Sequence, residues 1–456
     1  MDIDGFRGRL ITAGDADYDT ARAVWNGAVD RHPRIVARCG GTADAAAAVR
    51  FAREHDLEIA VRGGGHNVAG TAVCDDGIVI DLSDMRAVWV DPAGRTAQVS
   101  GGALWGDVDH ETQAYGLATT GGIVGHTGVG GLTLGGGIGF LMRKHGLAVD
   151  NLLAAEVVTA DGSIVRASAD EHPELFWALR GGGGNFGVVT SFRFALHPVG
   201  PTVLAGPVFW AAEDTTDVLR FYRSFAAEAP DELGSVVRLG TVPPLPVVPG
   251  ELHGRPAVAV VCCYAGAVED GERAVRALRR FGTPLVDLLA PTPYAAFQGA
   301  LDDTVPHGWH YYWKAAGLDG LSDAAIAVIA DHAYRAGSPL SYASLFHLGG
   351  AVARVPREAT AYAGRDVAHH IVIDAVWLPG ESGERAAPET EWARRFLHAL
   401  RPHSAEGVYV NFLDSDDGAD RVRQAYGGQV HRRLGEVKAK YDPDNAFHHN
   451  KNILPG

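Results

Sequence analysis

His66 is the residue with the clearest chemical potential, because it directly follows Gly63, Gly64 and Gly65. Glycines carry no side chains, so a large ligand can approach the backbone of such a run closely. A neutral imidazole is a nucleophile, and an ordinary pKa of about 6.5 leaves the ring mostly neutral at cellular pH. The run therefore favours a loop that holds a ligand beside a nucleophilic histidine. The alternative is that His66 hydrogen-bonds a neighbouring carbonyl.

The elements on either side of this loop are both predicted to be strands. Residues 57–61 and 77–82 are short apolar runs bounded by turn residues, which is typical of buried strands. In a Rossmann fold, the glycine-rich turn instead opens a helix and follows the pattern Gly-x-Gly-x-x-Gly, with an acidic residue about 20 positions later. The context of this loop therefore argues against a nicotinamide-dinucleotide fold.

Two more glycine-dense segments follow in the first part of the chain. Ten of the nineteen residues from 121 to 139 are glycine, and residues 181–187 contain five more. Glycine loses more backbone entropy on folding than any other residue, so something must compensate for so many of them. Backbone amides exposed by glycines can donate hydrogen bonds to a pyrophosphate. Each loop alone is compatible with a tight turn, but together they favour a dinucleotide site.

The order of predicted elements indicates an α+β chain. The first unit combines strands with an amphipathic helix at residues 43–54. After Pro198 glycine becomes rarer, and alternating strands separated by long gaps predict an antiparallel sheet with helices on one face. The other expected elements are strands at 35–39 and 188–194, strands at 257–264, 310–315, 345–352 and 371–377, a strand at 408–413, and a helix at 420–440.

Composition narrows the class of protein further. A length of 456 residues suggests two or three domains, and 46% hydrophobic residues are enough for sizeable cores. No apolar run reaches the roughly 20 residues that cross a bilayer, and the first residues lack the basic-then-apolar order of a secretion signal. We therefore expect a cytoplasmic protein without a membrane partner. A net charge of −15 without a basic patch argues against nucleic acid. The four cysteines lack metal-ligand spacing and are expected to be buried free thiols.

Five ordered motifs are distributed along the chain. They are Arg62-Gly-Gly-Gly-His66-Asn67, Thr127-Gly-Val-Gly-Gly-Leu-Thr-Leu-Gly-Gly-Gly-Ile-Gly139, Arg180-Gly-Gly-Gly-Gly-Asn-Phe-Gly187, Tyr409-Val-Asn411, and Tyr441-Asp-Pro-Asp-Asn445 with Asn452-Ile-Leu-Pro455. In type, order and spacing they resemble the motifs of the berberine-bridge-enzyme-like FAD-linked oxidases. The resemblance implies a PCMH-type FAD-binding domain of two α/β subdomains with an inserted substrate domain of antiparallel sheet and helices. The implied domains are FAD-binding (1–200), substrate-binding (201–404) and a C-terminal return to the FAD-binding domain (405–456).

The resemblance also implies one covalent bond between the chain and FAD. In the family, the histidine that matches His66 is bonded to the 8α carbon of the flavin, and many members add a second bond through a cysteine. Val124 occupies the cysteine position here, so a single bond is expected. Arg62 either contacts the pyrophosphate or packs against its own loop. The residues expected to bind the cofactor are Arg62, Gly63, Gly64, Gly65, His66, Asn67, Gly70, Gly122, His126, Thr127, Gly128, Gly130, Gly131, Gly136, Gly137, Gly139, Gly183, Asn185, Gly187, Val188, Tyr409, Asn411 and Asn450.

The reaction implied by the resemblance is oxidation of an alcohol, sugar or natural-product carbinol, with O2 as acceptor and H2O2 as product. A small-molecule substrate and O2 are thus the expected partners. Such a reaction needs a base, and Tyr409 is the first choice, although a phenol with an ordinary pKa of about 10 needs stabilising donors for this role. Tyr409 could instead pack on the flavin ring, and Tyr426 or His431 could be the base. A dehydrogenase with another acceptor and a flavin-loaded binding protein without turnover are the alternative functions.

Candidate substrate contacts come from the middle sheet. By strand alternation, Tyr311 and Trp313 face one side, and Tyr312 and Lys314 face the other. Trp313 and His347 are the substrate candidates. His347, Asp374 and Trp377 lie on strands that could line the same cavity, although a core or surface position is the favoured interpretation of each. No metal site is expected, because the acidic cluster at 414–420 lacks the glutamate of a calcium loop and is better interpreted as a solvated turn.

Overall fold

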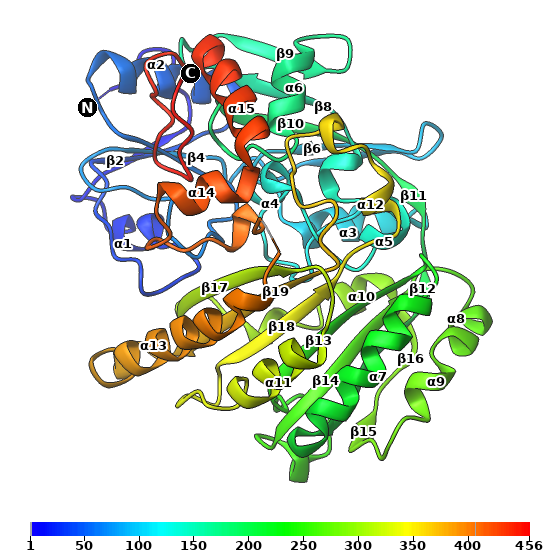
Figure 1. The fold of residues 1–456 in the computed structure, drawn as a ribbon. Coiled ribbons are helices and arrows are strands. Elements are labelled where there is room, and N and C mark those ends of the chain that lie inside the picture. The colour runs from blue at the N-terminus through cyan, green and yellow to red at the C-terminus, as the bar shows by residue number, and fades with distance from the viewer. Residues whose placement is uncertain (1, 406) are drawn as a thin grey trace.

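The computed structural model describes residues 2–405 and 407–456 and has an α+β architecture, as predicted. Figure 1 shows two regions: the smaller sheets and both chain ends lie in one, and a large sheet lies in the other. The first 200 residues and the C-terminal helices α14 (Ala419–Tyr426) and α15 (Gly428–Tyr441) form the first region. Across the described residues, no helix is long and apolar enough to cross a bilayer. The four cysteines are buried and free.

The sheet that carries the His66 loop has four strands in the order β1-β2-β4-β3. β3 and β4 run parallel, and the glycine loop connects them, as the apolar runs predict. Ile78 and Ile80 of β4 are fully buried against the alanine-rich helix α2, and Val79 is buried in a second core on the opposite face of the sheet. The strands and helix are β1 (Arg9–Ile11), β2 (Ile35–Arg38), β3 (Ile59–Arg62), β4 (Ile78–Asp81) and α2 (Thr42–Glu54).

A five-stranded antiparallel sheet follows, in the order β5-β6-β10-β8-β9. Its buried side packs against helices and against the second glycine segment, where part of that segment forms the short helix α4. These elements are β5 (Val88–Asp91), β6 (Thr96–Ser100), β8 (Leu152–Val158), β9 (Ile164–Ser168), β10 (Val188–Ala195), α3 (Trp105–Gln113), α4 (Val129–Gly135), α5 (Met142–His145) and α6 (Pro173–Leu179), followed by the separate strand pair β7 (Leu117–Ala118) and β11 (His197–Pro198). The short helix α1 (Tyr18–Arg22) packs on the four-stranded sheet instead.

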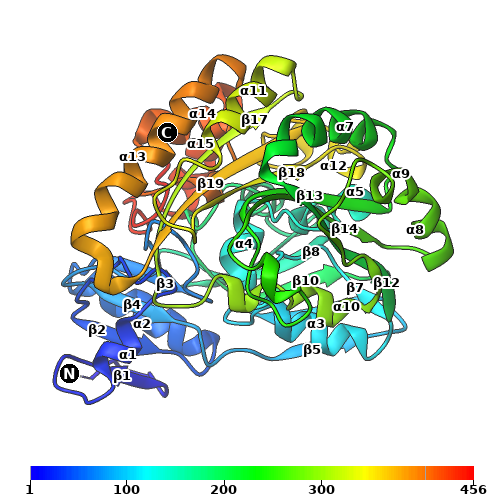
Figure 2. The ribbon, with the colours of Figure 1, turned by 90° about the horizontal axis from the view of Figure 1, so that it is seen from below.

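The second region is an eight-stranded antiparallel sheet with helices on its outer face (Figure 2). Apolar side chains on that face form one core with α7, α11 and α13, whereas the inner face packs toward the first region. The strands are β12 (Thr202–Ala211), β13 (Leu233–Thr241), β14 (Pro256–Tyr264), β15 (Val286–Asp287), β16 (Ala290–Pro293), β17 (His310–Leu318), β18 (Tyr342–His347) and β19 (His369–Trp377). The helices are α7 (Thr215–Glu228), α8 (Val268–Ala274), α9 (Arg276–Arg279), α10 (Tyr294–Gln298), α11 (Asp323–His332), α12 (Ala351–Arg354) and α13 (Ser382–Leu400).

Three predicted elements differ from the structure. The strand expected at 345–352 begins and ends earlier, at Tyr342–His347, because Gly349 and Gly350 have positive φ and lead into α12. The prediction of a strand at 408–413 is wrong: Val410–Phe412 is a 3-10 turn, in which the Phe412 amide donates to the Tyr409 carbonyl at 2.9 Å and the Leu413 amide to the Val410 carbonyl at 3.2 Å. The helix expected at 420–440 is broken into α14 and α15 at Gly427, where φ is 70°.

Candidate functional site

A cavity lies between the glycine-rich segments and the inner face of the eight-stranded sheet. It encloses about 1980 Å³ that no protein atom fills, part of it open to solvent. Backbone forms much of one wall, and side chains from β13, β17, β18 and β19 form the other. The predicted residues that line it are Gly63, Gly64, Gly65, His66, Asn67, Gly122, Thr127, Gly128, Gly130, Gly131, Gly183, Asn185, Gly187, Trp313, Tyr409, Asn411, Tyr426 and Asn450.

Two of the glycine segments touch each other through their backbones. A Cβ atom on Gly64 would lie 2.5 Å from both the Cα and the N of Gly128, which is closer than real Cβ contacts. Gly131 also lines the cavity, but a Cβ there would meet nothing within 4 Å. Gly64 is therefore required for the packing of two loops, whereas Gly131 keeps part of the wall free of side chains.

The His66 ring is held from two sides. One face stacks on Trp25, with ring centroids 4.2 Å apart and planes at 15°. Its Nε2 lies 3.0 Å from Nδ1 of His126, and Nε2 of His126 lies 3.3 Å from the carbonyl oxygen of Asp302. Burial, with smaller contributions from His126 and His307, holds the pKa of His66 well below its ordinary value. The imidazole is therefore neutral, as a nucleophile must be.

The third glycine loop is fastened to the C-terminal segment. The Asn185 side chain donates to the Gly182 carbonyl at 2.9 Å and accepts from the Ile453 amide at 3.0 Å. Asn450 donates to the Gly184 carbonyl of the same loop at 3.2 Å and to the Phe447 carbonyl at 3.0 Å. The two predicted asparagines thus hold the last residues of the chain against the cavity.

Several buried polar atoms beside the cavity have no hydrogen-bond partner among the described residues. They are the Tyr426 hydroxyl and the side-chain oxygens of Asn67 and Asn450. Buried polar groups are normally satisfied, so their presence along one cavity indicates a polar ligand. His431 lies in the first turn of α15 with its ring 6.4 Å from Tyr426, and it does not line the cavity.

The sheet wall is centred on Asp374. Tyr342 and Trp313 are its cross-strand partners on either side, so the three side chains share one face. Asp374 is 2% exposed, and its Oδ2 has no hydrogen-bond partner in the described part of the chain. Burial raises the pKa of Asp374 to about 7, and Arg238 and a hydrogen bond from Tyr342 limit the rise. A carboxylate with this pKa can accept a proton near neutral pH.

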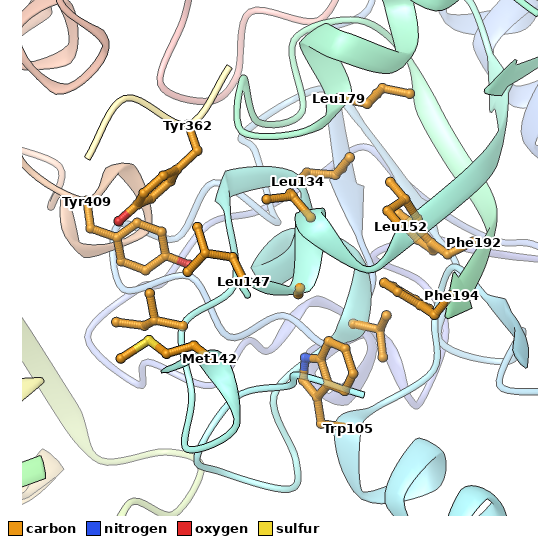
Figure 3. Packing of buried hydrophobic residues seen from close by; sticks show 14 of the residues in the cluster. Trp105, Leu134, Met142, Leu147, Leu152, Leu179, Phe192, Phe194, Tyr362 and Tyr409 are labelled. Atoms are coloured by element: carbon orange, nitrogen blue, oxygen red, sulfur yellow. The ribbon is translucent and has the colours of Figure 1, made fainter. Parts of the chain in front are cut away.

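Tyr409 lies where the two walls meet. Its hydroxyl oxygen accepts hydrogen bonds from the Gly137 amide and from Nδ2 of Asn411, both at 2.8 Å. Burial raises the pKa of Tyr409 to about 12 in spite of these two donors. Figure 3 shows its ring beside Tyr362 at the edge of a buried apolar cluster. This environment favours a packing role and disfavours a phenolate.

Two of the predicted residues, Arg62 and His347, lie outside the cavity. Arg62 forms an ion pair with Asp81, and His347 contacts Arg143. Arg62 donates to the fully buried carboxylate of Asp81 at 2.6 Å, so it packs against its own loop instead of facing a pyrophosphate. His347 lies on the helix-covered face of β18, 3.1 Å from the guanidinium of Arg143, so we do not retain it as a substrate contact.

Six other predicted residues lie outside the cavity: His126, Val188 and four glycines. His126 lies behind His66. Val188 is fully buried in the core of the first region, and its neighbour Val189 lines the cavity instead. The four glycines, with positive φ or with a backbone atom where a Cβ would be, shape turns and close contacts; they are Gly70, Gly136, Gly137 and Gly139.

Sequence reasoning did not select Trp25, Tyr342 or Arg238, and it set Asp374 aside as a core or surface residue. A carboxylate inside the otherwise apolar strand β19 was a usable signal for Asp374, because a buried charge is costly unless it has a role. Trp25 carries no such signal, since it belongs to no motif and reaches His66 only through the fold.

The acidic cluster at 414–420 is only partly the solvated turn that the sequence predicts: Asp416 and Asp420 are exposed, whereas Asp414 is buried and Asp417 is half-buried. Asp417 accepts from the buried ammonium of Lys314 at 2.9 Å, and Asp414 is 3% exposed and accepts from the Trp313 amide at 2.7 Å. Lys451, which lines the cavity, donates to the Asp414 carbonyl at 2.6 Å. Burial lowers the pKa of Lys451 to about 8. These contacts fasten the C-terminal return to the large sheet.

Comparison with known proteins agrees with this geometry. Residues 33–168 match the FAD binding domain family model, and residues 408–454 match the model described as berberine and berberine like. The chain is 33% identical to (R)-6-hydroxynicotine oxidase of Paenarthrobacter nicotinovorans, over 98% of this chain and 97% of the relative. It is 29% identical to xylooligosaccharide oxidase of Thermothelomyces thermophilus, over 98% and 92%.

Solved structures give the same result. The crystal structure of 6-hydroxy-D-nicotine oxidase from Arthrobacter nicotinovorans has a TM-score of 0.85 at 32% identity and covers 99% of both chains. Glucooligosaccharide oxidase from Acremonium strictum has a TM-score of 0.87 at 25% identity, covering 98% of this chain and 97% of its own. The fold and site define an FAD-linked oxidoreductase with a PCMH-type FAD-binding domain. The chain belongs to the berberine-bridge-enzyme-like FAD-linked oxidases.

The residues present fit FAD. Glycine backbone on three loops leaves room for a dinucleotide, and the unpaired polar atoms of Asn67, Tyr426 and Asn450 supply groups that a ligand would satisfy. Gly63, Gly130 and Gly131 line the cavity at positions where backbone amides would approach its phosphates or rings. 

Proposed function

We propose that this protein is an oxidase that takes a hydride from the CH–OH group of an alcohol, sugar or natural-product carbinol and passes the electrons to O2, giving H2O2. Bound FAD would supply the two-electron acceptor for this reaction. The observation that carries the proposal is a neutral, buried histidine on one wall of a cavity whose opposite wall presents a carboxyl group with a pKa of about 7.

We propose that residues 1–200 and 405–456 bind the cofactor and that residues 201–404 bind the substrate. His66 would form the single covalent bond to FAD. The glucooligosaccharide oxidase relative carries a 6-S-cysteinyl, 8α-N1-histidyl FAD. In this chain the aliphatic side chain of Val124 lines the cavity and has no atom that can form a thioether. His66 and Val124 together therefore support a flavin with one covalent bond to the protein.

Within the proposed reaction, Asp374 is a better base than Tyr409. The Asp374 carboxylate would accept the hydroxyl proton of the substrate, while Tyr342 and Arg238 hold the carboxylate in place. The Tyr409 oxygen already accepts two hydrogen bonds, and its pKa of about 12 leaves little phenolate near neutral pH.

The rings on the sheet wall fit a ring-bearing substrate. Trp313, Tyr342, Phe346 and Phe412 all line the cavity around Asp374. Aromatic faces bury apolar ring surface, and a nearby carboxylate and guanidinium orient hydroxyl groups. Both a sugar ring and an aromatic carbinol match this combination.

Three measurements on the purified protein test the proposal. Yellow colour that stays with acid-precipitated protein supports the covalent bond, and colour that leaves with the supernatant contradicts it. Anaerobic mixing with a panel of sugars and ring-bearing alcohols should bleach the flavin; a stable colour with every compound would indicate a binding protein. Admitting O2 to the bleached protein should restore the colour within seconds and release H2O2, whereas slow recovery would indicate a dehydrogenase.

A further inference from the structure

His66, His126 and Asp302 form a chain of contacts that leads away from the cavity. Nε2 of His126 faces a backbone carbonyl, which can only accept, so Nε2 must carry the proton. In a neutral His126 the other nitrogen, Nδ1, is then an acceptor. Nδ1 faces Nε2 of His66, so the proton of the neutral His66 ring lies on Nε2.

The contacts between His66, His126 and Asp302 determine which nitrogen of His66 is the nucleophile. With the proton on Nε2, the lone pair available for bond formation is on Nδ1. The stacked ring of Trp25 at 4.2 Å and the hydrogen bond to His126 hold the imidazole in this orientation. His126 does not line the cavity, so its position suits a group that acts on His66 from behind.

We propose that His126 is the proton acceptor for covalent attachment of FAD to His66, with the Asp302 carbonyl fixing its tautomer. The inference rests on the proposed covalent bond at His66. It deepens that function by assigning the residue that makes the bond form.

The step balances as follows. A bond forms between Nδ1 of His66 and the 8α carbon, a C–H bond of that carbon breaks, and the ring proton on Nε2 passes to Nδ1 of His126. Two protons and two electrons are thereby released. The isoalloxazine takes up the two electrons, and O2, the oxidant, finally receives both electrons and both protons to give H2O2. His126 must hold the proton only transiently, because its Nε2 proton remains bonded to the Asp302 carbonyl.

Replacement His126→Asn separates a proton-accepting role from a structural one. An asparagine oxygen can still accept a hydrogen bond from His66, but it cannot take up the proton. The matched control is His307→Asn, because the His307 ring lies 5.0 Å from that of His126 and 6.2 Å from that of His66 without a hydrogen bond to either in the described contacts.

The experiment uses apoprotein from riboflavin-starved cells, mixed with FAD in air. Covalent flavin is followed over time in acid-precipitated protein, at several FAD concentrations. We expect the limiting rate of attachment to fall at least 100-fold in His126→Asn, the range of general acid–base catalysis, at an unchanged half-saturating FAD concentration. His307→Asn should stay within threefold of the wild type.

The outcomes are distinguishable. Covalent attachment in His126→Asn within threefold of the wild-type rate overturns the inference and leaves the proposed function intact. Wild-type protein that never holds FAD covalently overturns the proposed bond and the inference with it. If His126→Asn does not fold, ¹⁵N NMR of histidine-labelled wild-type apoprotein decides: a proton on Nε2 of His66 supports the inference, and a proton on Nδ1 overturns it.

Discussion

The two walls of the cavity are built in opposite ways. The wall that carries His66 combines glycine backbone from three loops with mainly aliphatic side chains. The sheet wall consists of side chains, with rings around one buried carboxyl group and one guanidinium. The first wall leaves room for a ligand because its glycines lack side chains, whereas the second wall offers a ligand the functional groups of its side chains.

This difference determines how each wall responds to change. On the backbone wall, a single added carbon can collide with a facing backbone that cannot move. On the side-chain wall, the removal of one functional group leaves the fold intact but removes the chemistry. Four predictions test this contrast, from the largest expected effect to the smallest.

Gly64→Ala should abolish the FAD-loaded protein. The added Cβ would lie 2.5 Å from the Gly128 backbone, so the first two glycine loops could not keep their contact. Flavin absorbance of the purified protein and its thermal unfolding are the measurements. Gly131→Ala is the matched control: its Cβ meets no protein atom within 4 Å, and alanine in helix α4 should leave the apoprotein as stable or about 0.5–1 kcal/mol more stable. Equal effects of the two substitutions would contradict a distinction between loop packing and ligand approach.

Asp374→Asn should lower the rate of flavin reduction about 10²–10⁴-fold, because the amide cannot accept the substrate proton. Stopped-flow bleaching under anaerobic conditions measures this rate with any substrate found in the panel. Ser344→Ala is the control, since Ser344 lines the same wall and is not expected to transfer a proton. A loss below about threefold in Asp374→Asn would remove this residue as the base.

The pKa of Asp374 also predicts a pH-dependent cost to stability. The folded-state pKa of about 7 lies above the ordinary value of about 4, so the folded state binds the proton more tightly. The stability contributed by this carboxyl therefore falls as pH rises from about 4 to 7 and is constant above that. Asp374→Asn should thus be more stable than the wild type by an amount that grows to at most about 4 kcal/mol at pH 8. Denaturant unfolding at pH 5 and pH 8 measures this difference, and an equal difference at both pH values would contradict a carboxyl whose pKa is raised by burial.

The same contrast explains what could be predicted from the sequence. The glycines of the first wall lie in contiguous runs, so short motifs were enough to predict that the loops around His66 meet at one ligand cavity. The glycines also misled locally: Gly136, Gly137 and Gly139 belong to the runs but face protein atoms, not the cavity. Arg62 is another such case, because its partner Asp81 comes from a strand that no motif connects to it.

The side-chain wall was hard to predict because it is assembled from strands far apart in sequence. Strands β17, β18 and β19 are buried on both faces, so apolar alternation does not reveal which face carries the cavity. Trp313 and His347 were therefore equivalent candidates, although only Trp313 faces the site. The segment around Tyr409 was mistaken for a strand because its apolar alternation reflects contacts with both walls, with no partner strand behind it.

Tyr409→Phe should have the smallest effect among the four predictions. It decides whether Tyr409, which lies where the two walls meet, has a packing role or acts as the base. Removal of the hydroxyl leaves the Gly137 amide without its acceptor and takes from the Asn411 side chain one of the two acceptors to which it donates. We expect the unfolding free energy to fall by about 1–3 kcal/mol. Flavin reduction should change by no more than about threefold, because the phenol with a pKa of about 12 is not the base. Denaturant unfolding and anaerobic bleaching give the two numbers on the same sample. A drop in reduction of 100-fold or more at unchanged stability would reverse the assignment and make Tyr409, not Asp374, the group that removes the proton.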